Sequence, residues 1–448
     1  MGPKIVFKFI GVLFFHDWLL SLIYIGIFIF LLIKGMKRPS YLIALYFITS
    51  IVNPQLTFQQ LYAMPLVLFA SIGCFISLII NQGTHRFRMP APYFTILLFL
   101  LASLVSYLSA QVPELAGKRF GEFNNVAIII FLTIPAIKER ADYSFISGSA
   151  LCSIYFLVLK NLVDTQLIGK WDNLHGSGGW LGDSNDWALA IAMTLPLSYG
   201  AILLAKSRKG KIFHVCACVS TLLVLTITSS RGGFLGAAAS SFVWLLTEKK
   251  RTRAIIMAFV GLFIVSLYMP TGYIERIRSI SDASQVARES WEGQERSNTE
   301  YTGGERTHFW RIAAEMAKDH PFTGVGWGNY VNSRKYYEAV PSTEVAHSTW
   351  FQVIAEAGYT GLFAFVLMIL VSMTILIRFM FKRACRDDAW LFTNTRILLA
   401  GMIGYCVSGT FVSREYSDLF FLYFALILAL PVLVNTDEKK QQDMGNAE

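Results

Sequence analysis

ERTHFWRIAAEMAKDHPFTGVGWGNY (305–330) and AHSTWFQVIAEAGYTG (346–361) gather charge, histidine, glycine and tryptophan in a chain that is otherwise mostly apolar. The first segment predicts an amphipathic helix that ends at the His320-Pro321 pair, because proline cannot continue a helix. A glycine-rich turn follows, and His347 then stands just before a long apolar run. An ionisable group at the mouth of a transmembrane helix is a functional-site candidate. We therefore expect the chemistry here.

The composition indicates a membrane protein. The chain has 448 residues, of which 54% are hydrophobic and only 15% are charged, whereas a soluble domain has about 25% charged residues. Many apolar runs approach the ~20 residues that cross a bilayer. The expected fold class is therefore an all-α polytopic membrane protein with about 12–14 transmembrane helices. The predicted spans are 18–33, 40–52, 62–80, 92–110, 122–137, 143–163, 186–205, 212–228, 232–247, 253–270, 349–377, 391–412 and 416–434.

The distribution of lysine and arginine predicts the orientation of these spans. Alternate connecting loops are rich in basic residues, and the loops between them are acidic on balance. Basic loops face the cytoplasm, so the net charge of +9 reports topology and does not indicate nucleic-acid binding. The basic loops are residues 34–38, 85–88, 138–140, 206–211, 248–253 and 378–388.

The loop lengths divide the chain into four parts. Residues 1–270 form an N-terminal transmembrane bundle, in which residues 4–16 are either a short extra span or an interfacial helix. Residues 271–348 form one large external loop, with an amphipathic helix over about 305–320, and its segment 271–300 is polar. Residues 349–434 form the C-terminal transmembrane helices. The polar tail 435–448 is expected to be cytoplasmic and disordered.

His347 and Arg231 are the leading candidates for chemistry. A neutral imidazole accepts a proton from a hydroxyl nucleophile, although histidine is also common at membrane interfaces without a catalytic role. Arg231 lies in a tight turn between two apolar runs, close to the outer boundary of the membrane, beside small residues that let a ligand approach. Its fork of donors suits a diphosphate. The alternative for Arg231 is an anchor on lipid headgroups.

Three charged residues on the amphipathic helix are weaker candidates. Arg306 stands at the predicted helix start, where the N-terminus itself attracts anions, and Glu305 precedes it. Arg311 is five residues further on and only partly shares the face of Arg306. Pairing with Glu305 or Glu315 on a solvated surface is an open alternative for Arg306 and is the favoured interpretation for Arg311.

Other polar residues stand at the outer ends of predicted spans. Arg119, next to Lys118, could add positive charge for an anionic ligand, but an interfacial anchor is favoured. There are two equally weighted interpretations of the group Asp183, Asn185 and Asp186. These residues either contact the substrate or simply cap the following helix. Arg414, in a tight external loop, is similar.

Other kinds of site are not indicated. The segment GVGWG (324–328) follows no strand and lies in an external loop, so a nucleotide-binding motif fails on context. No HxxxH, CxxC or carboxylate cluster indicates a metal. The six cysteines are read as packing residues, because their spacing fits neither a zinc site nor a disulfide framework. No metal and no cofactor is expected.

Several motifs together resemble the O-antigen ligase and polymerase family, the bacterial membrane glycosyltransferases that use polyprenyl-diphosphate-linked glycans. These are SSRGGFLG (229–236), GERTHFWRIAAEMAKDHPFTGVGWGNY (304–330) and AHSTWFQVIAEAGYTGLFAF (346–365). DSNDWALAIAMTLPL (183–197) looks like the branch of putative O-glycosylation ligases associated with the exosortase system. The second half of the chain is covered well. The first half matches mainly in its span pattern and in NPQLTF (53–58).

The resemblance implies a metal-independent enzyme of the all-helical GT-C-like class in the bacterial inner membrane, with its active site facing the periplasm. His347 matches the essential histidine of the family, Arg231 its arginine in the Arg-Gly turn, and Arg306 its loop arginine. The implied donor is undecaprenyl diphosphate carrying a glycan, held by Arg231 and Arg306 with Arg119. The acceptor is lipid A–core in a ligase, another lipid-linked glycan in a polymerase, or a protein side chain, and a ligase is the first choice.

A transporter of lipid-linked glycans is the alternative from another class. It would need broken helices and polar residues near the bilayer midplane, commonly with an internal repeat. Here the unusual charges cluster at the outer boundary and most spans have apolar centres. Enzymatic chemistry on a lipid headgroup is therefore favoured over passage across the membrane.

Overall fold

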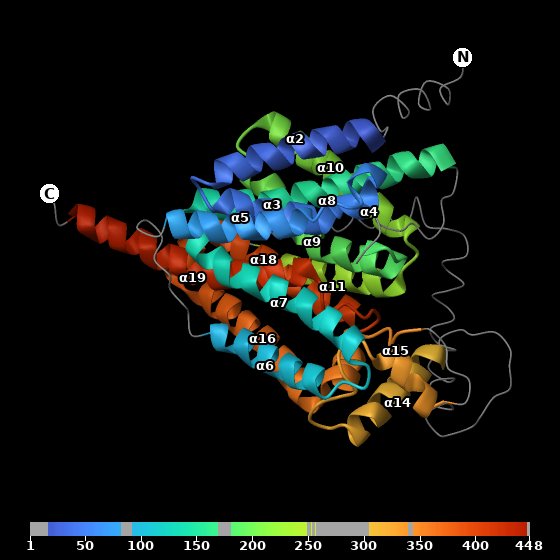
Figure 1. The fold of residues 1–448 in the computed structure, drawn as a ribbon. Helices are drawn as coiled ribbons and strands as arrows, with labels where there is room; N and C mark the ends of the chain where they lie inside the picture. The colour runs from blue at the N-terminus through green and yellow to red at the C-terminus, as the bar shows by residue number, and fades with distance from the viewer. Residues whose placement is uncertain are drawn as a thin grey trace, which may run out of the picture.

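The computed structural model describes residues 17–81, 92–168, 181–248, 252, 256, 304–338 and 344–445. Throughout these ranges the regular elements are helices, and no strand is assigned in them. Most of them run side by side in one bundle (Figure 1). The helices are α2 (Asp17–Gly35), α3 (Ser40–Val52), α4 (Pro54–Thr57), η1 (Gln59–Leu61), α5 (Leu66–Ile80), α6 (Tyr93–Leu108), α7 (Pro113–Ala136), α8 (Arg140–Ile168), α9 (Ser184–Leu204), α10 (Arg208–Ile227), α11 (Arg231–Thr247), α14 (Gly304–Asp319), α15 (Tyr330–Ser333), η3 (Arg334–Tyr336), α16 (Thr349–Phe381), α17 (Arg383–Asp387), α18 (Ala389–Gly409) and α19 (Asp418–Gly445).

The helices confirm an all-α polytopic membrane protein. Five are long and apolar enough to cross a bilayer, namely α2, α8, α9, α10 and α16, and α5, α6 and the first part of α19 are shorter apolar helices. Four further predicted spans coincide with α3, α7, α11 and α18. The predicted span 253–270, the segment 4–16 and the polar segment 271–300 fall outside the described residues, apart from the single residue 256.

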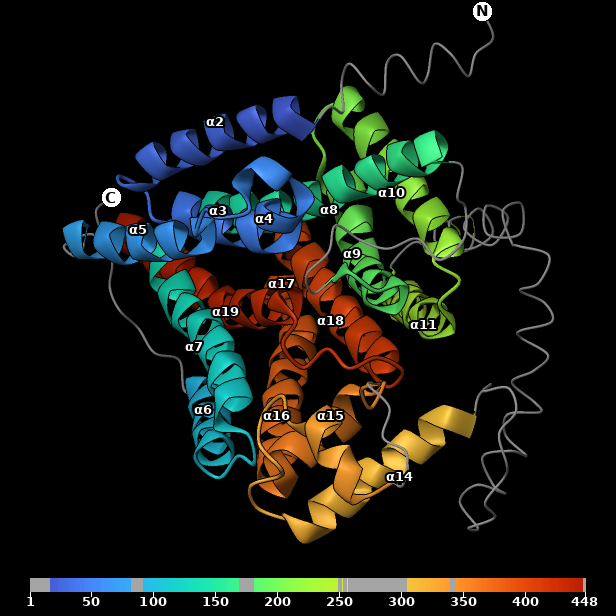
Figure 2. The ribbon, with the colours of Figure 1, turned by 45° about the vertical axis from the view of Figure 1, so that its right-hand side comes forward.

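Central and peripheral helices differ in how they bury apolar side chains. Residues 419–430 of α19 and 187–195 of α9 are buried on every side, which is typical of helices inside a large bundle. By contrast, Ile33 of α2 and Ile80 of α5 are 65% and 64% exposed. Figure 2 shows α2 and α5 at the edge of the bundle, and α9, α18 and α19 further in. The exposed apolar faces of the peripheral helices suit contact with lipid.

Two helix ends differ from the sequence prediction. The helix predicted over 122–137 begins nine residues earlier, at Pro113, because proline fits the first turn of a helix. Arg119 is therefore helical. The tail from residue 435 was expected to be disordered, but α19 continues to Gly445. Its Lys, Gln, Asp and Met residues include good helix formers, which can extend a helix that the bundle has already nucleated.

The glycine turn at 324–328 closes against a break in α16. The backbone leaves helical geometry at Gly358, with φ 67° and ψ −170°. The carbonyls of Ala355 and Glu356 accept hydrogen bonds from the N–H groups of Val325 (2.9 Å) and Gly326 (3.0 Å). The turn thus satisfies backbone acceptors that an unbroken helix would satisfy itself. It fixes α14 and α15 at the end of the bundle where α16 begins (Figures 1 and 2).

Replacing Gly358 by alanine should destabilise the protein. The conformation at this position is essentially restricted to glycine, with a cost of about 1–3 kcal/mol for other residues. In addition, an added Cβ would lie 2.6 Å from the carbonyl oxygen of Pro321. Thermal unfolding in detergent should show a clearly lower Tm for Gly358→Ala.

Gly121→Ala in α7 is the matched control, because a Cβ there meets nothing within 4 Å. Alanine in a helix is favoured over glycine by roughly 0.5–1 kcal/mol, so this variant should keep or slightly raise the Tm. Equal Tm values for Gly358→Ala and the wild type would contradict the proposed role of the break.

Candidate functional site

A polar cavity of about 670 Å³ lies near the junction of α16 with the glycine turn. Its walls come from the end of α3, the first half of α7, the glycine turn, the first turns of α16 and the segment that joins α18 to α19. It is lined by two arginines and four acidic residues, namely Arg119, Arg414, Glu122, Glu356, Glu415 and Asp418. Carboxylates therefore outnumber cations in the lining.

Glu356 of α16 lies at the centre of the hydrogen-bonding network. Its side chain is 1% exposed. The carboxylate accepts hydrogen bonds from Gln352 Nε2 (2.6 Å), from the backbone N–H of Tyr330 (3.3 Å) and from the hydroxyl of Tyr416 (3.3 Å). A buried carboxylate needs such partners. Glu356 thereby joins α16 to α15 and to the α18–α19 segment.

Glu415 is a second buried carboxylate in the same cavity. It is 4% exposed, and its Oε2 has no hydrogen-bond partner among the described residues. Burial and the nearby charge of Glu356 raise the pKa of Glu415 to about 8, because both disfavour the charged form. At neutral pH this group is therefore largely protonated and able to donate a hydrogen bond into the cavity.

The N-terminal ends of α9, α11 and α16 meet beside this cavity. Ser230, the N-cap of α11, donates to Asn185 Oδ1 in the first turn of α9 (2.8 Å). Arg414 forms an ion pair with Asp186 of α9, and its backbone N–H donates to Thr349 Oγ1 at the start of α16 (3.0 Å). Arg414 therefore links the ends of α9 and α16, and Ser230 links the end of α11 to that of α9.

These helix ends favour an anion. Each helix N-terminus carries roughly half a positive charge. The first turns of α11 and α16 contain no acidic residue, whereas Asp186 lies in the first turn of α9. Arg231, as the first residue of α11, adds a full positive charge at the same place. The ends of α11 and α16 with Arg231 are thus the most favourable position for a negatively charged group.

The glycines after Arg231 have a different role from the one expected. The sequence suggested that they let a ligand approach. In the structure, an added Cβ would lie 2.7 Å from Phe411 Cβ at Gly232, 2.2 Å from Ala188 Cβ at Gly233 and 1.8 Å from Ser408 Oγ at Gly236. The glycines therefore allow α11 to pack closely against α9 and α18.

His347 lies directly before α16, close to the polar cavity. Its Nε2 lies 3.0 Å from a carboxylate oxygen of Glu344, and its ring centroid lies 6.0 Å from that of Phe309 in α14. The neighbouring residues are held firmly, since Ser348 N donates to Ser413 Oγ (3.2 Å) and Ala346 N to Gln352 Oε1 (3.0 Å). The imidazole itself is half-buried.

The backbone of His347 is strained. Among the described residues, the non-glycine residues with positive φ are His347, Ser229 and Asn53, with φ of 50°, 54° and 46°. Ser229 lies two residues before Arg231, and Asn53 lines the polar cavity. Such conformations cluster at functional sites, where the surrounding structure holds them. All three lie around the region formed by the cavity and the helix N-termini.

Helix α14 contacts His347 through Phe309 and carries three of the predicted residues, Glu305, Arg306 and Arg311. Arg306 lies in its first turn and is partly buried, and Phe309 one turn later contacts His347. Arg311 forms an exposed pair with Glu315 (3.9 Å), as expected for a solvated helix face. Glu305 is in the first turn of α14, but its side chain is not among those described.

The remaining predicted residues divide into lining and structural positions. Arg119 lines the cavity, donates to Glu122 Oε2 (2.9 Å) and lies over the ring of Tyr416 (5.4 Å). Asp183 accepts from the backbone N–H of Asn185 (2.7 Å) and is the N-cap of α9. Among the described residues, no three His, Cys, Asp or Glu side chains form a group that could hold a metal.

The acidic lining of the cavity was not predicted from the sequence. Glu356 is a carboxylate within an apolar run, which is itself a functional signal, and Glu415 adjoins a predicted residue. Glu122 and Asp418 stand at the ends of spans and read as interfacial charges. Only the fold shows that these four residues line one cavity.

The raised pKa of Glu415 predicts a pH dependence of stability. A carboxyl whose pKa is about 8 in the folded protein and 4.5 when unperturbed binds its proton more tightly when folded. The contribution of Glu415 to the free energy of unfolding is therefore complete below pH 4.5. It is lost as the pH rises through about 8. Glu415→Gln should have a flatter Tm profile between pH 5 and pH 8 than the wild type.

Glu122→Gln is the control for this experiment, because its carboxylate lines the same cavity but is 45% exposed. It should retain the wild-type slope. A Glu415→Gln profile as steep as that of the wild type would show that Glu415 is not the group responsible.

Two families of known proteins match parts of the chain. Residues 216–366 match the O-Antigen ligase family, and residues 19–170 match a family of unknown function (DUF5935). Among curated proteins, none matches the chain. The first matched region contains Arg231, Arg306 and His347, and the second contains Arg119. The resemblance indicated by the sequence is thereby confirmed, since residues 216–366 match the O-Antigen ligase family.

Proposed function

We propose that the protein transfers a glycan from undecaprenyl diphosphate to an acceptor hydroxyl at the periplasmic face of the bacterial inner membrane. The match of residues 216–366 to the O-Antigen ligase family implies a ligase or polymerase activity of the glycosyltransferase type. Lipid A–core is the acceptor in our proposal. The observation that carries it is the series of contacts that connects the N-terminus of α11, which bears Arg231, through α9 and Arg414 to the N-terminus of α16, which follows His347.

The diphosphate of the donor binds at these helix ends in our proposal. Arg231 supplies a permanent charge and a fork of donors, and the partial positive charge of the two helix ends adds to it. Arg414 supports the same site, because its buried Nε has no hydrogen-bond partner among the described residues. Arg306, in the first turn of α14, is the third arginine of the site. Such groups stabilise the leaving diphosphate in the transition state.

The glycan of the donor occupies the polar cavity. Its four acidic residues make it unsuitable for a diphosphate, but carboxylates accept hydrogen bonds from sugar hydroxyls. A protonated Glu415 donates one in return. Arg119 was expected at the diphosphate, but its contacts with Glu122 and Tyr416 support a place beside the glycan. Separate sites for the anionic and sugar parts of the donor follow from this division of charge.

His347 is the general base. When the neutral imidazole carries its proton on Nε2, that N–H donates to Glu344 and leaves Nδ1 as the acceptor. Glu344 is then a positioning residue that fixes the tautomer. The acceptor hydroxyl passes its proton to Nδ1, and its oxygen forms a bond to the anomeric carbon. The bond from that carbon to the phosphate oxygen breaks, and undecaprenyl diphosphate leaves with inversion at the anomeric centre.

A transfer assay in nanodiscs tests the function. Purified protein receives an undecaprenyl-diphosphate-linked glycan and one acceptor at a time: lipid A–core, a second lipid-linked glycan or a peptide. Glycan transfer and release of undecaprenyl diphosphate are both followed. Transfer to lipid A–core supports the ligase, whereas chain growth on the donor or transfer to the peptide would assign the polymerase or protein-glycosylating activity. Movement of the donor across the bilayer without transfer would instead support a transporter.

His347→Gln should lower kcat by about 10²–10⁴-fold, the usual contribution of a general base. Glu344→Gln should have a smaller effect, since the amide can still hold the imidazole. His320→Gln, at the other end of the α14 segment, is the control and should leave the rate unchanged. Full activity of folded His347→Gln would exclude the assigned base.

Arg231→Lys should reduce kcat/KM strongly, because an ammonium group cannot reproduce the paired donors of a guanidinium. Arg311→Lys is the matched control, since Arg311 forms only an exposed pair with Glu315. Both variants keep the net charge, so a difference between them reports donor geometry. If the two variants behave alike, Arg231 does not bind the diphosphate.

A further inference from the structure

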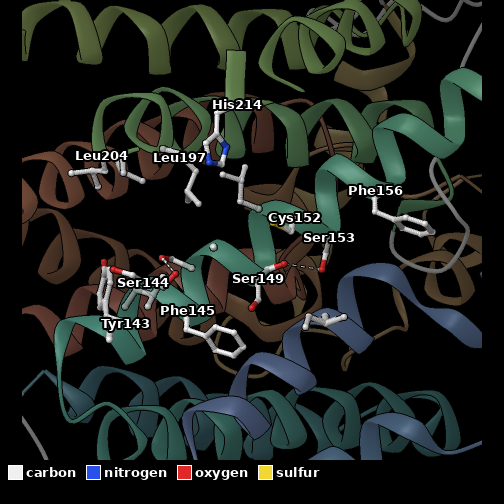
Figure 3. Close-up of a pocket in the computed structure, with 18 of the residues that line it drawn as sticks. Tyr143, Ser144, Phe145, Ser149, Cys152, Ser153, Phe156, Leu197, Leu204 and His214 are labelled. Carbon is white, nitrogen blue, oxygen red and sulfur yellow. Dashed lines mark hydrogen bonds between the residues drawn. The ribbon is translucent and has the colours of Figure 1, made fainter. Parts of the chain in front are cut away.

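A large apolar groove lies outside the candidate site. Its volume is about 990 Å³, at the upper end of the roughly 300–1,000 Å³ of small-molecule sites. It runs among α2, α8, α9, α10 and α18. Leu20, Phe156, Leu197 and Leu426 are typical of its lining. Figure 3 shows His214 directed from α10 toward the labelled side chains of α8 and α9.

The serines of α8 do not make this groove strongly polar. Ser147 donates to the carbonyl of Ser144 (3.4 Å), and Ser153 to that of Ser149 (3.0 Å), as the dashed line in Figure 3 shows for the second pair. Their hydroxyls are thus satisfied by the helix itself. Gly148 lies among them in the lining, and a Cβ added there meets nothing within 4 Å. Small side chains therefore leave room along this face of α8.

One end of the groove is basic. Arg140, Lys206 and Trp390 line it there, each at or next to a helix end. Arg140 pairs with Asp388 (2.6 Å) and lies over the ring of Trp390 (5.1 Å). Lys206 is exposed and has no carboxylate partner among the described residues. The opposite end, near Leu20, Val52 and Phe58, is apolar.

This basic end is distant from the candidate site. Lys206 follows the last turn of α9, whereas Asp183 caps its first turn. A helix of 21 residues is about 30 Å long at 1.5 Å per residue. One lipid phosphate therefore cannot bind at both places. The groove needs an occupant other than the diphosphate of the donor.

We propose that the groove binds an anionic glycerophospholipid of the cytoplasmic leaflet. Lys206 and Arg140 hold the phosphate, and the acyl chains lie along α8 toward Leu20 and Phe58. Basic pockets between transmembrane helices on the cytoplasmic side bind such headgroups, and the basic loops place this end in the cytoplasm. The buried Nδ1 of His214, which has no hydrogen-bond partner among the described residues, faces the ester region of the lipid. The bound lipid joins α8 to α9, α10 and α18.

Native mass spectrometry of the detergent-purified full chain tests the proposal. The protein is titrated with phosphatidylglycerol or phosphatidylcholine of the same chain length, and the Tm is measured with each lipid. The wild type should bind phosphatidylglycerol more tightly and gain Tm from it, because a ligand that binds only the folded state stabilises it. Equal binding of the two lipids would overturn the proposal, as would displacement of phosphatidylglycerol by equimolar undecaprenyl phosphate.

Two variants with matched controls separate the basic end from the groove. Lys206→Gln should weaken phosphatidylglycerol binding about fivefold, and Lys209→Gln, exposed in the same basic segment but outside the lining, should not. Gly148→Phe should abolish binding by filling the groove. Gly26→Phe is its control, since that exposed glycine also has open space but does not line the groove. Wild-type lipid binding by Gly148→Phe would overturn the proposal. An unchanged preference of Lys206→Gln for phosphatidylglycerol would also overturn it. This second test does not depend on whether Gly148→Phe folds.

Discussion

The closure of the glycine turn 324–328 on the break in α16 is the constraint on which the candidate site depends. The break at Gly358 exposes two carbonyls, and the turn supplies the N–H groups that satisfy them. An unsatisfied backbone group would be costly here, because Val325, Ala355 and Glu356 are buried. Because the turn is held, Glu356 reaches Tyr330 and Tyr416, and α14 is kept beside the start of α16. A polar site can therefore form at the end of an apolar bundle.

The site separates charges of opposite sign. Acidic residues line the cavity between α3, α7 and α16. The helix ends next to the cavity are positive instead. Arg231 is the first residue of α11, and the first turns of α11 and α16 contain no acidic residue. This division suits a ligand with a neutral polar part and an anionic part, such as a glycan linked to a diphosphate. The groove with Lys206 lies at the other end of α9. In our proposals both ends of the bundle therefore bind phosphate. The donor diphosphate binds at one end, and a glycerophospholipid binds at the other.

The sequence predicted the helices better than it predicted the cavity. Apolar runs of nearly bilayer length give the spans directly, and proline explains why α7 starts earlier than its apolar part. The turn containing Arg231 was recognised, but the purpose of its glycines was not, because contact with Phe411 and Ala188 joins residues far apart in the chain. Glu356 and Glu415 were missed for the same reason. In the sequence each is an isolated charge, and only the packing of the α18–α19 segment against α16 brings the two together.

In our proposal the N-terminal ends of α11 and α16, with Arg231, bind the diphosphate next to His347. The most direct test of this binding is a cryo-electron microscopy structure of the protein in nanodiscs with undecaprenyl diphosphate. The account predicts that the two phosphates lie within hydrogen-bonding distance of the Arg231 guanidinium and the first N–H groups of these helices. Phosphates found inside the acidic cavity, or at the Lys206 end of the groove, would contradict it.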